Sequence, residues 1–165
     1  MLSLASSWAD GLEQHGRPAP SGAAGLMPEN GEYRLTLAND LAELRRMSQW
    51  LERSCHAMGL AAARCSELEL CANEAVTNIV SYGYEAPGRR EILLRLARVA
   101  AGVSLTIEDD GRPFNPLAAQ VPVQPASLAV AGIGGLGIKL IRGMMAECHY
   151  QHRGGKNILT LIAQP

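Results

Sequence analysis

Hydrophobic and polar positions along the chain change their spacing from segment to segment, and each spacing predicts an element of secondary structure. Residues 32–38 alternate between apolar and polar side chains, which is typical of a strand with one buried face. Residues 40–59 and 62–82 instead repeat apolar side chains every three or four positions, as the buried stripe of an amphipathic helix does. We expect Asn39 or Asp40 to cap the first of these two helices.

The second half of the chain shows the same two periodicities. Alternation predicts a hairpin of two strands over 91–100 and 103–111, and two further strands over 148–153 and 157–164. A third helix is predicted over 136–146. Because each helix must bury one stripe and each strand one face, we expect an α/β fold. Its architecture is a two-layer sandwich, with the helices packed on one face of a mostly antiparallel, mixed sheet.

Composition divides the 165-residue chain into a tail, a domain and an internal loop. Residues 1–30 contain Gly, Pro, Ser and Ala without sustained periodicity, so we expect a flexible N-terminal tail. Residues 31–165 are expected to form one domain, because 47% of the chain is hydrophobic and this is enough for a core. Inside this domain, residues 112–131 form a loop that is long for a compact fold, and such loops are commonly functional.

Charge and composition argue against several classes of function. The net charge is −1 and aromatic residues make up 4% of the chain, so we expect no nucleic-acid partner. No run of about 18 apolar residues is present that would span a membrane, and the N-terminus lacks the basic region of a secretory signal. The four cysteines form no CxxC pair, which favours free thiols in a reducing compartment, so we expect a cytoplasmic protein.

The segment "ELELCANEAVTNIVSYGY" places polar groups beside the apolar stripe of the second predicted helix. Glu74 and Asn78 are four residues apart and therefore share one side of that helix. A carboxylate one turn from a carboxamide could hold a metal–phosphate unit and leave a base free. The alternative is structural, because a buried Asn side chain also serves as a hydrogen-bond link between helices.

The segment "TIEDDGRPFNP" ends a predicted strand with two adjacent carboxylates. Asp109 and Asp110 repel each other, and burying either is costly unless another group accepts its charge. One carboxylate at a strand end can receive the exocyclic amine of a purine, while the other faces water. The alternative is an ordinary β-turn, for which the Asp-Gly pair at Asp110 and Gly111 is well suited.

The segment "GIGGLGI" over residues 132–138 precedes the third predicted helix. It formally fits GxGxxG, but the dinucleotide-binding fingerprint needs an acid about 20 residues later, and the first acid after Gly137 is Glu147. A phosphate-binding Walker loop is also excluded, because Lys139 does not directly follow Gly137. The remaining interpretation is an anion site, in which free backbone N–H groups and the helix N-terminus bind phosphate.

Together, the order and spacing of these three segments resemble those of the GHKL (Bergerat-fold) ATP-binding domains. "NEAVTN" is similar to the N-box, "DDGRPF" to the G1 box and "GIGGLGI" to the G2 box of that superfamily. Within it, the chain most resembles the anti-sigma factor serine/threonine kinases, to which "GGLGIKLIRGMM" and "GGKNILTL" are also similar. The resemblance covers residues 30–163, which is nearly the whole predicted domain.

The resemblance implies a role for each polar group of the first two segments. Asn78 would coordinate the Mg²⁺ that bridges the phosphates of ATP, and Glu74 would be the general base. Asp109 would accept a hydrogen bond from the adenine amine, and Gly111 would let the ring approach. The chemistry is coherent, because phosphoryl transfer depends mostly on positioning and charge neutralisation.

The resemblance also assigns the C-terminal half of the site. Thr160 would support the adenine-binding aspartate through water, and the loop at 112–131 would be the ATP lid. Four residues of the glycine-rich segment would present backbone amides to the phosphates: Gly134, Gly135, Leu136 and Gly137.

The partners implied by the resemblance are proteins. The substrate would be a STAS-domain anti-sigma factor antagonist, phosphorylated on Ser or Thr, and the sequestered partner a sigma factor or a similar regulator. The family is commonly homodimeric. One alternative is a non-catalytic, ATP-gated binding module of the same fold. Another is the ATP domain of a sensor histidine kinase, which would need a phosphoacceptor His on a dimerising helix, and neither His15 nor His56 lies in such a context.

Overall fold

The computed structural model describes residues 31–85, 88–118 and 141–164 of the chain. Within these ranges the predicted strands and the first two predicted helices are present. Their ends lie within two residues of the predicted ones, except that α1 begins four residues later than predicted because a 3-10 turn occupies residues 41–43. In chain order the elements are β1 (Glu32–Ala38), the 3-10 turn η1 (Leu41–Glu43), α1 (Leu44–Ala57), α2 (Ala62–Tyr82), β2 (Glu91–Val99), β3 (Gly102–Asp109), β4 (Glu147–Arg153) and β5 (Lys156–Ala163).

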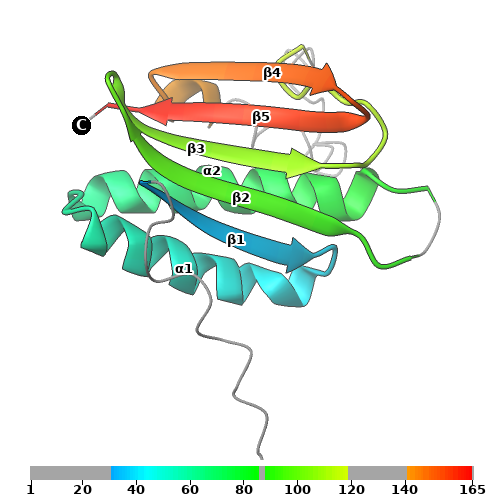
Figure 1. Cartoon of the computed structure of the whole chain (residues 1–165), viewed down its shortest axis with the longest axis horizontal. Coiled ribbons are helices and arrows are strands. Elements are labelled where there is room, and N and C mark those ends of the chain that lie inside the picture. The colour runs from blue at the N-terminus through cyan, green and yellow to red at the C-terminus, as the bar shows by residue number, and fades with distance from the viewer. Residues whose placement is uncertain (1–30, 86–87, 119–140, 165) are drawn as a thin grey trace, which may run out of the picture.

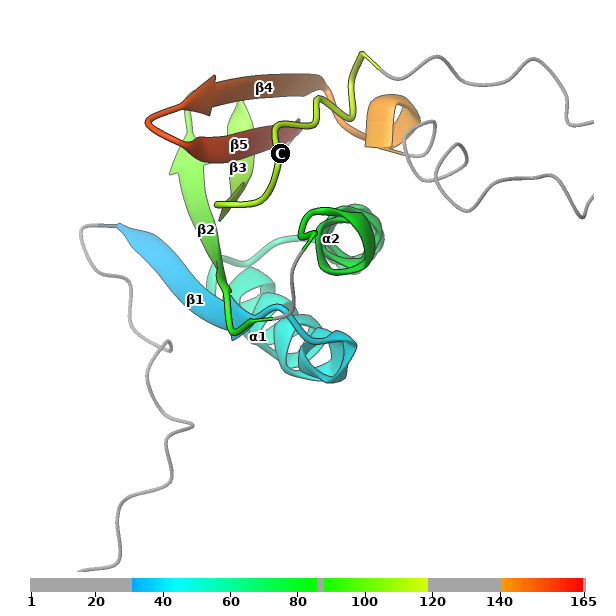
Figure 2. The ribbon, with the colours of Figure 1, turned by 90° about the vertical axis from the view of Figure 1, so that its right-hand side faces the viewer.

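The strands form one sheet in the order β1-β2-β3-β5-β4. Each pairing of neighbouring strands in the described residues is antiparallel. In Figure 1 the strands β3, β5 and β4 lie above α2, whereas β2 and β1 overlap the helices in that view; the turned view in Figure 2 shows both helices on the same side of the sheet. The predicted two-layer α/β architecture is therefore confirmed. Its crossover inserts β5, the last strand in sequence, between β3 and the edge strand β4.

The turn that leads into α1 uses both candidate capping residues, for different purposes. Asp40 caps η1, because its side chain accepts a hydrogen bond from the backbone N–H of Ala42 at 2.9 Å. Asn39 instead joins β1 to the segment before β2: its side chain donates to Gly88 O at 3.2 Å and accepts from Arg90 N at 3.0 Å. The start of the first helix is thus fixed to the neighbouring strand.

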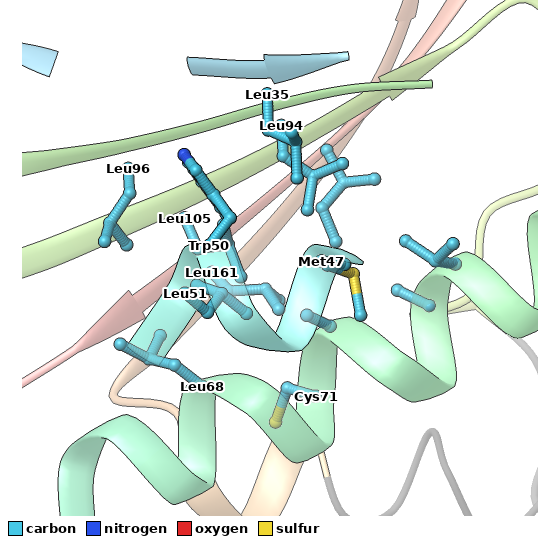
Figure 3. Close-up of a cluster of buried hydrophobic side chains, with 14 of the residues drawn as sticks. Leu35, Met47, Trp50, Leu51, Leu68, Cys71, Leu94, Leu96, Leu105 and Leu161 are labelled. Atoms are coloured by element: carbon cyan, nitrogen blue, oxygen red, sulfur yellow. The ribbon is translucent and has the colours of Figure 1, made fainter. Parts of the chain in front are cut away.

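The core fills the space between the sheet and the two helices (Figure 3). Alternate side chains of the central strands point into it, as the period of two along a strand requires. From α2, the buried residues are Leu68, Cys71, Ala72, Ala75 and Val76. The alternation continues to the ends of β3 and β5, so a polar residue at a core-facing position there lies at the rim of the core.

The hairpin between β4 and β5 turns at two glycines, as predicted. Gly154 and Gly155 have φ angles of 61° and 74°, which glycine adopts without the steric penalty that a side chain would bring. The tight turn fixes the register of the two strands, in which His152 lies opposite Asn157. This register places Tyr150 and His152 on the same face of the sheet as Asn157.

Several predictions fall outside the described residues. These are the tail at 1–30, most of the loop at 112–131 and the glycine-rich stretch at 132–137. Residues 141–144 are helical, in agreement with the end of the third predicted helix. In the part of the chain that the structure describes, no helix is long and apolar enough to cross a membrane.

Candidate functional site

Asp109 ends β3 with its carboxylate buried at the rim of the core. Only 4% of the residue is exposed. Its Oδ1 atom accepts two hydrogen bonds, from the backbone N–H of Gly111 at 2.8 Å and from Asn157 Nδ2 at 3.0 Å. A buried carboxylate requires such donors, because leaving its charge without partners would cost several kcal/mol.

The balance of forces on Asp109 is unusual for a surface-turn aspartate. Burial raises the pKa of its carboxyl group, and the neighbouring charge of Asp110 acts in the same direction. The hydrogen bonds from Asn157 and Gly111 oppose this shift, since they stabilise the charged form. Burial and two fixed donors distinguish Asp109 from an exposed turn aspartate, and this setting makes it a candidate site residue.

Asn157 holds this carboxylate, although no sequence motif predicted a role for it. It is 7% exposed, and its amide NH₂ also donates to two backbone carbonyls, Gly111 O at 3.2 Å and Arg112 O at 3.1 Å. One side chain thus secures both the carboxylate and the loop that follows it. The available signal was its position: Asn157 is a polar residue in the core-facing set of β5, which continues with Leu159, Leu161 and Ala163.

Thr160 does not support Asp109, and that assignment is wrong. In the register of β3 and β5, Asp109 pairs with Asn157, whereas Thr160 pairs with Thr106. Thr160 is three residues from Asn157, so its side chain points to the opposite face of the sheet. The residue that supports the carboxylate from β5 is therefore Asn157.

Gly111 brings the loop after β3 against the C-terminal end of α2. The N–H of Arg112 donates to Gly83 O at 2.8 Å. A Cβ atom on Gly111 would lie 2.7 Å from Gly83 O and 2.8 Å from Asp109 Oδ1, closer than real Cβ contacts allow. Glycine at this position is thus required by the close approach of two backbone segments.

Asp110 and Asp109 have separate environments, as the sequence analysis expected of two adjacent carboxylates. Asp110 Oδ2 lies 3.5 Å from Arg90 Nη1, and the side chain of Asp110 is about one-third exposed. Tyr84 lies close to both carboxylates, and burial raises the pKa of its phenol, with Asp109 and Asp110 adding to the effect. The loop after α2 therefore forms one wall beside the aspartates.

Glu74 and Asn78 lie one turn apart on α2, both half-buried beside its core-facing stripe. They share one side of the helix with the buried Cys71, which precedes Glu74 by three residues. Burial raises the pKa of the Cys71 thiol to about 12, and the adjacent groups that add to this are Cys148 on β4 and the carboxyls of Glu67 and Glu74. The two polar side chains therefore lie on the side of α2 that carries Cys71, beside the core-facing stripe.

The strands β2 to β5, the helix α2 and the buried carboxylate lie within a segment that matches a known protein family. The model of the histidine kinase-like ATPase domain matches residues 37–163. The chain belongs to this family. It is also 38% identical over 114 residues to serine/threonine-protein kinase BtrW of Bordetella bronchiseptica, a match that covers 69% of this chain and 80% of BtrW. The resemblance drawn from the sequence motifs is thereby confirmed.

The solved structures that resemble this chain are more distant. The histidine kinase domain of the Erythrobacter litoralis EL346 blue-light activated histidine kinase has a TM-score of 0.48 and 18% identity, covering 75% of this chain and 60% of that chain. The Acinetobacter baumannii histidine kinase AdeS has a TM-score of 0.43 and 15% identity, covering 79% of this chain and 68% of that chain. The present chain spans less than two thirds of the length of the EL346 domain.

Membership of this family makes the protein an ATP-binding, kinase-like domain. A magnesium ion at this site would have to be held jointly with the nucleotide. In residues 31–85, 88–118 and 141–164, no group of three or more His, Cys, Asp or Glu side chains could hold a metal by itself. Mg²⁺ prefers oxygen ligands and keeps waters, so the amide oxygen of Asn78 with phosphate and water oxygens would complete its shell.

Proposed function

We propose that the protein is an ATP-dependent serine/threonine kinase that phosphorylates another protein. The observation that carries this proposal is the buried carboxylate of Asp109, held by Gly111 and Asn157 beside the end of α2. The match to a serine/threonine-protein kinase over most of the chain supports the same activity.

Asp109 would recognise the adenine base. Both hydrogen bonds that it accepts from the described residues end on Oδ1. Oδ2 is therefore the oxygen that would accept a hydrogen bond from the exocyclic amine of adenine. A charged acceptor in a desolvated setting makes a stronger bond than a neutral one, which suits it to this recognition.

The phosphates would lie between α2 and the glycine-rich segment. We propose that Asn78 ligates Mg²⁺, which neutralises phosphate charge when bound. The backbone amides of four residues, which lie outside the described ranges, would donate to the same phosphates: Gly134, Gly135, Leu136 and Gly137. Gly111 would give the adenine ring its close approach to the backbone.

Glu74 would serve as the general base. Its carboxylate takes the proton of the incoming Ser or Thr hydroxyl while that oxygen attacks the γ-phosphorus of ATP. The bond between the γ-phosphorus and the bridging oxygen breaks, ADP leaves, and a phosphoserine or phosphothreonine forms. Glu74 and Asn78 are one helical turn apart, a spacing that supports action on the same phosphate.

The partners would be those of a partner-switching cycle in the cytoplasm. We propose that the ATP-bound protein holds a sigma factor or a similar regulator, and that a STAS-domain antagonist competes for it and is phosphorylated. A homodimer is part of this proposal. The helices cover one face of the sheet, and the other face carries half-buried apolar side chains such as Leu93, Ile158 and Ile162 that a second copy would cover.

The test is labelling of a source-cell lysate with γ-labelled ATP, Mg²⁺ and the purified protein. We expect one small protein to be labelled on Ser or Thr by the wild type and not by Glu74→Ala, and mass spectrometry identifies it. If no protein is labelled although ATP binding is confirmed by calorimetry, the kinase proposal is wrong and the chain is an ATP-gated binding module.

A further inference from the structure

Two side chains of the edge strand β4 reach the amide that holds Asp109. The Tyr150 hydroxyl donates to Asn157 Oδ1 at 2.8 Å, and His152 Nδ1 lies 3.2 Å from the same oxygen. Nothing in the assigned roles of the site uses either residue. They extend the hydrogen-bond chain outward, from the carboxylate through one amide to the edge of the sheet.

The pairing of β4 with β5 explains why both side chains meet Asn157. His152 lies directly opposite Asn157, and Tyr150 lies opposite Leu159, two residues along the same face. A directly opposite neighbour and its diagonal neighbour are both within reach of an aromatic side chain across an antiparallel pair. The tight Gly154–Gly155 turn fixes this register, so the contact is built into the hairpin.

The direction of each hydrogen bond follows from the other partners of Asn157. Its amide nitrogen faces three acceptors, namely Asp109 Oδ1, Gly111 O and Arg112 O. A flipped amide would place its oxygen against all three, so Oδ1 must point toward β4. That oxygen only accepts, and therefore both Tyr150 and His152 donate to it, the latter from a protonated Nδ1.

Tyr150 is suited to remain a donor at neutral pH. Burial raises the pKa of its phenol; the backbone amide of Phe114 opposes this rise, and the nearby charge of Asp109 adds a smaller rise. The hydroxyl therefore keeps the proton that it donates. The chain of bonds from Tyr150 to Asp109 is directional throughout, and each member fixes the orientation of the next.

We propose that Tyr150 is a positioning residue for adenine recognition, with His152 as a second donor: through Asn157 it holds Asp109 in the orientation that leaves Oδ2 facing the base. This inference rests on the proposed role of Asp109. It differs from a general structural role in one respect. Loss of the Tyr150 hydroxyl should weaken the bond to the 6-amino group of adenine and leave the binding of the phosphates unchanged.

The test measures the affinity of two nucleotides by calorimetry with Mg²⁺: ATP, and purine riboside triphosphate, which lacks the 6-amino group. For Tyr150→Phe we expect the affinity for ATP to fall about 3- to 10-fold, which is the range of one hydrogen bond. The affinity for the analogue should change by no more than about 2-fold. His152→Ala should act in the same direction. Tyr33→Phe and His149→Ala are the matched controls, because neither residue hydrogen-bonds to Asn157 within the described contacts, and both should keep the wild-type preference.

Two other outcomes would each overturn one of the proposed roles. If Tyr150→Phe lowers the affinity for both nucleotides equally, or for neither, Tyr150 does not position the carboxylate of Asp109. The inference then fails, while the proposed role of Asp109 stands. If the wild type binds both nucleotides equally, the role of Asp109 in adenine recognition fails, and this inference fails with it. Thermal unfolding of each variant, with and without nucleotide, shows whether any loss of binding follows from a loss of folded protein.

Discussion

Asn157 Nδ2 lies 3.0 Å from Asp109 Oδ1, across a strand pair that joins residues 48 positions apart in the sequence. Both residues are almost fully buried, and each satisfies part of the hydrogen-bonding need of the other. The contact exists because β5 inserts beside β3 with Asp109 and Asn157 in register. The sheet topology therefore creates this buried pair, since burial of the carboxylate at this rim would be costly without a donor from β5.

Replacement of Asp109 by Asn should separate binding from stability. The variant keeps an oxygen that can accept from Gly111 and Asn157, but it presents an NH₂ group where adenine needs an acceptor. We expect ATP affinity to fall roughly 10- to 100-fold, because bonds to charged groups contribute about 1.5–3 kcal/mol. Asp110→Asn is the control, since Asp110 pairs with Arg90 at the surface. Unchanged ATP affinity of Asp109→Asn by calorimetry would remove this residue from the adenine site.

The same variant should be at least as stable as the wild type at neutral pH. Burial raises the pKa of Asp109 in the folded protein above that of the unfolded chain. A raised carboxyl pKa means that the folded state holds the proton more tightly, so stability is lost as pH rises through the folded pKa. The Asp109→Asn variant has no carboxyl group to ionise, so it does not lose this stability. Its higher free energy of unfolding relative to the wild type should vanish below the pKa of Asp109 in the unfolded chain. Urea unfolding of both proteins across this pH range measures it, and a variant less stable at neutral pH would contradict the account.

Gly111 should not tolerate a methyl group, whereas Gly88 should. A Cβ atom at Gly111 would be 2.7 Å from Gly83 O, and the backbone on both sides would have to move. We expect Gly111→Ala to lower the free energy of unfolding by about 1–3 kcal/mol, the usual cost of overpacking, and to weaken ATP binding. Gly88→Ala meets nothing within 4 Å and should behave as the wild type in both assays. Equal behaviour of the two variants would mean that the loop after β3 is free of α2.

The thiols should divide into two reactivity classes. Cys55 and Cys71 are fully buried, and burial raises the pKa of each to about 12. At pH 8 only about one such thiol in ten thousand is a thiolate, so both should resist alkylation in the folded protein. Cys65 and Cys148 are partly exposed and provide the internal comparison. Mass spectrometry after iodoacetamide treatment measures each site, and rapid alkylation of Cys71 would contradict the packing of α2.

The periodicity of the chain was enough to predict the fold, because each helix and strand buries one regular face. The alternation over 32–38 and the helical spacing over 62–82 match β1 and α2 to the residue. The strand that ends in two carboxylates was also a local pattern, but that pattern did not say which of Asp109 and Asp110 is buried; the resemblance singled out Asp109, and the structure buries it. Local patterns thus locate the elements and the pair of aspartates.

Asn157 could not be found in this way, because its role depends on which residue of β5 lies opposite Asp109. That register is a tertiary property, and an error of an odd number of residues moves a side chain to the other face of the sheet. The assignment of Thr160 failed for this reason. The role of the Tyr150 hydroxyl depends on a second register, between β4 and β5, and was equally inaccessible.

The central claim, that Glu74 acts as the base in phosphoryl transfer, is tested most directly by the rate of transfer from γ-labelled ATP to the protein substrate identified by labelling. Glu74→Gln keeps the size and polarity of the side chain but cannot take a proton. The account predicts a transfer rate about 10²- to 10⁴-fold below that of the wild type. The affinity of Glu74→Gln for Mg-ATP should stay within about 2-fold of the wild-type value. The control Glu69→Gln, on the same helix, should be as active as the wild type. A Glu74→Gln protein that transfers phosphate at the wild-type rate would contradict it.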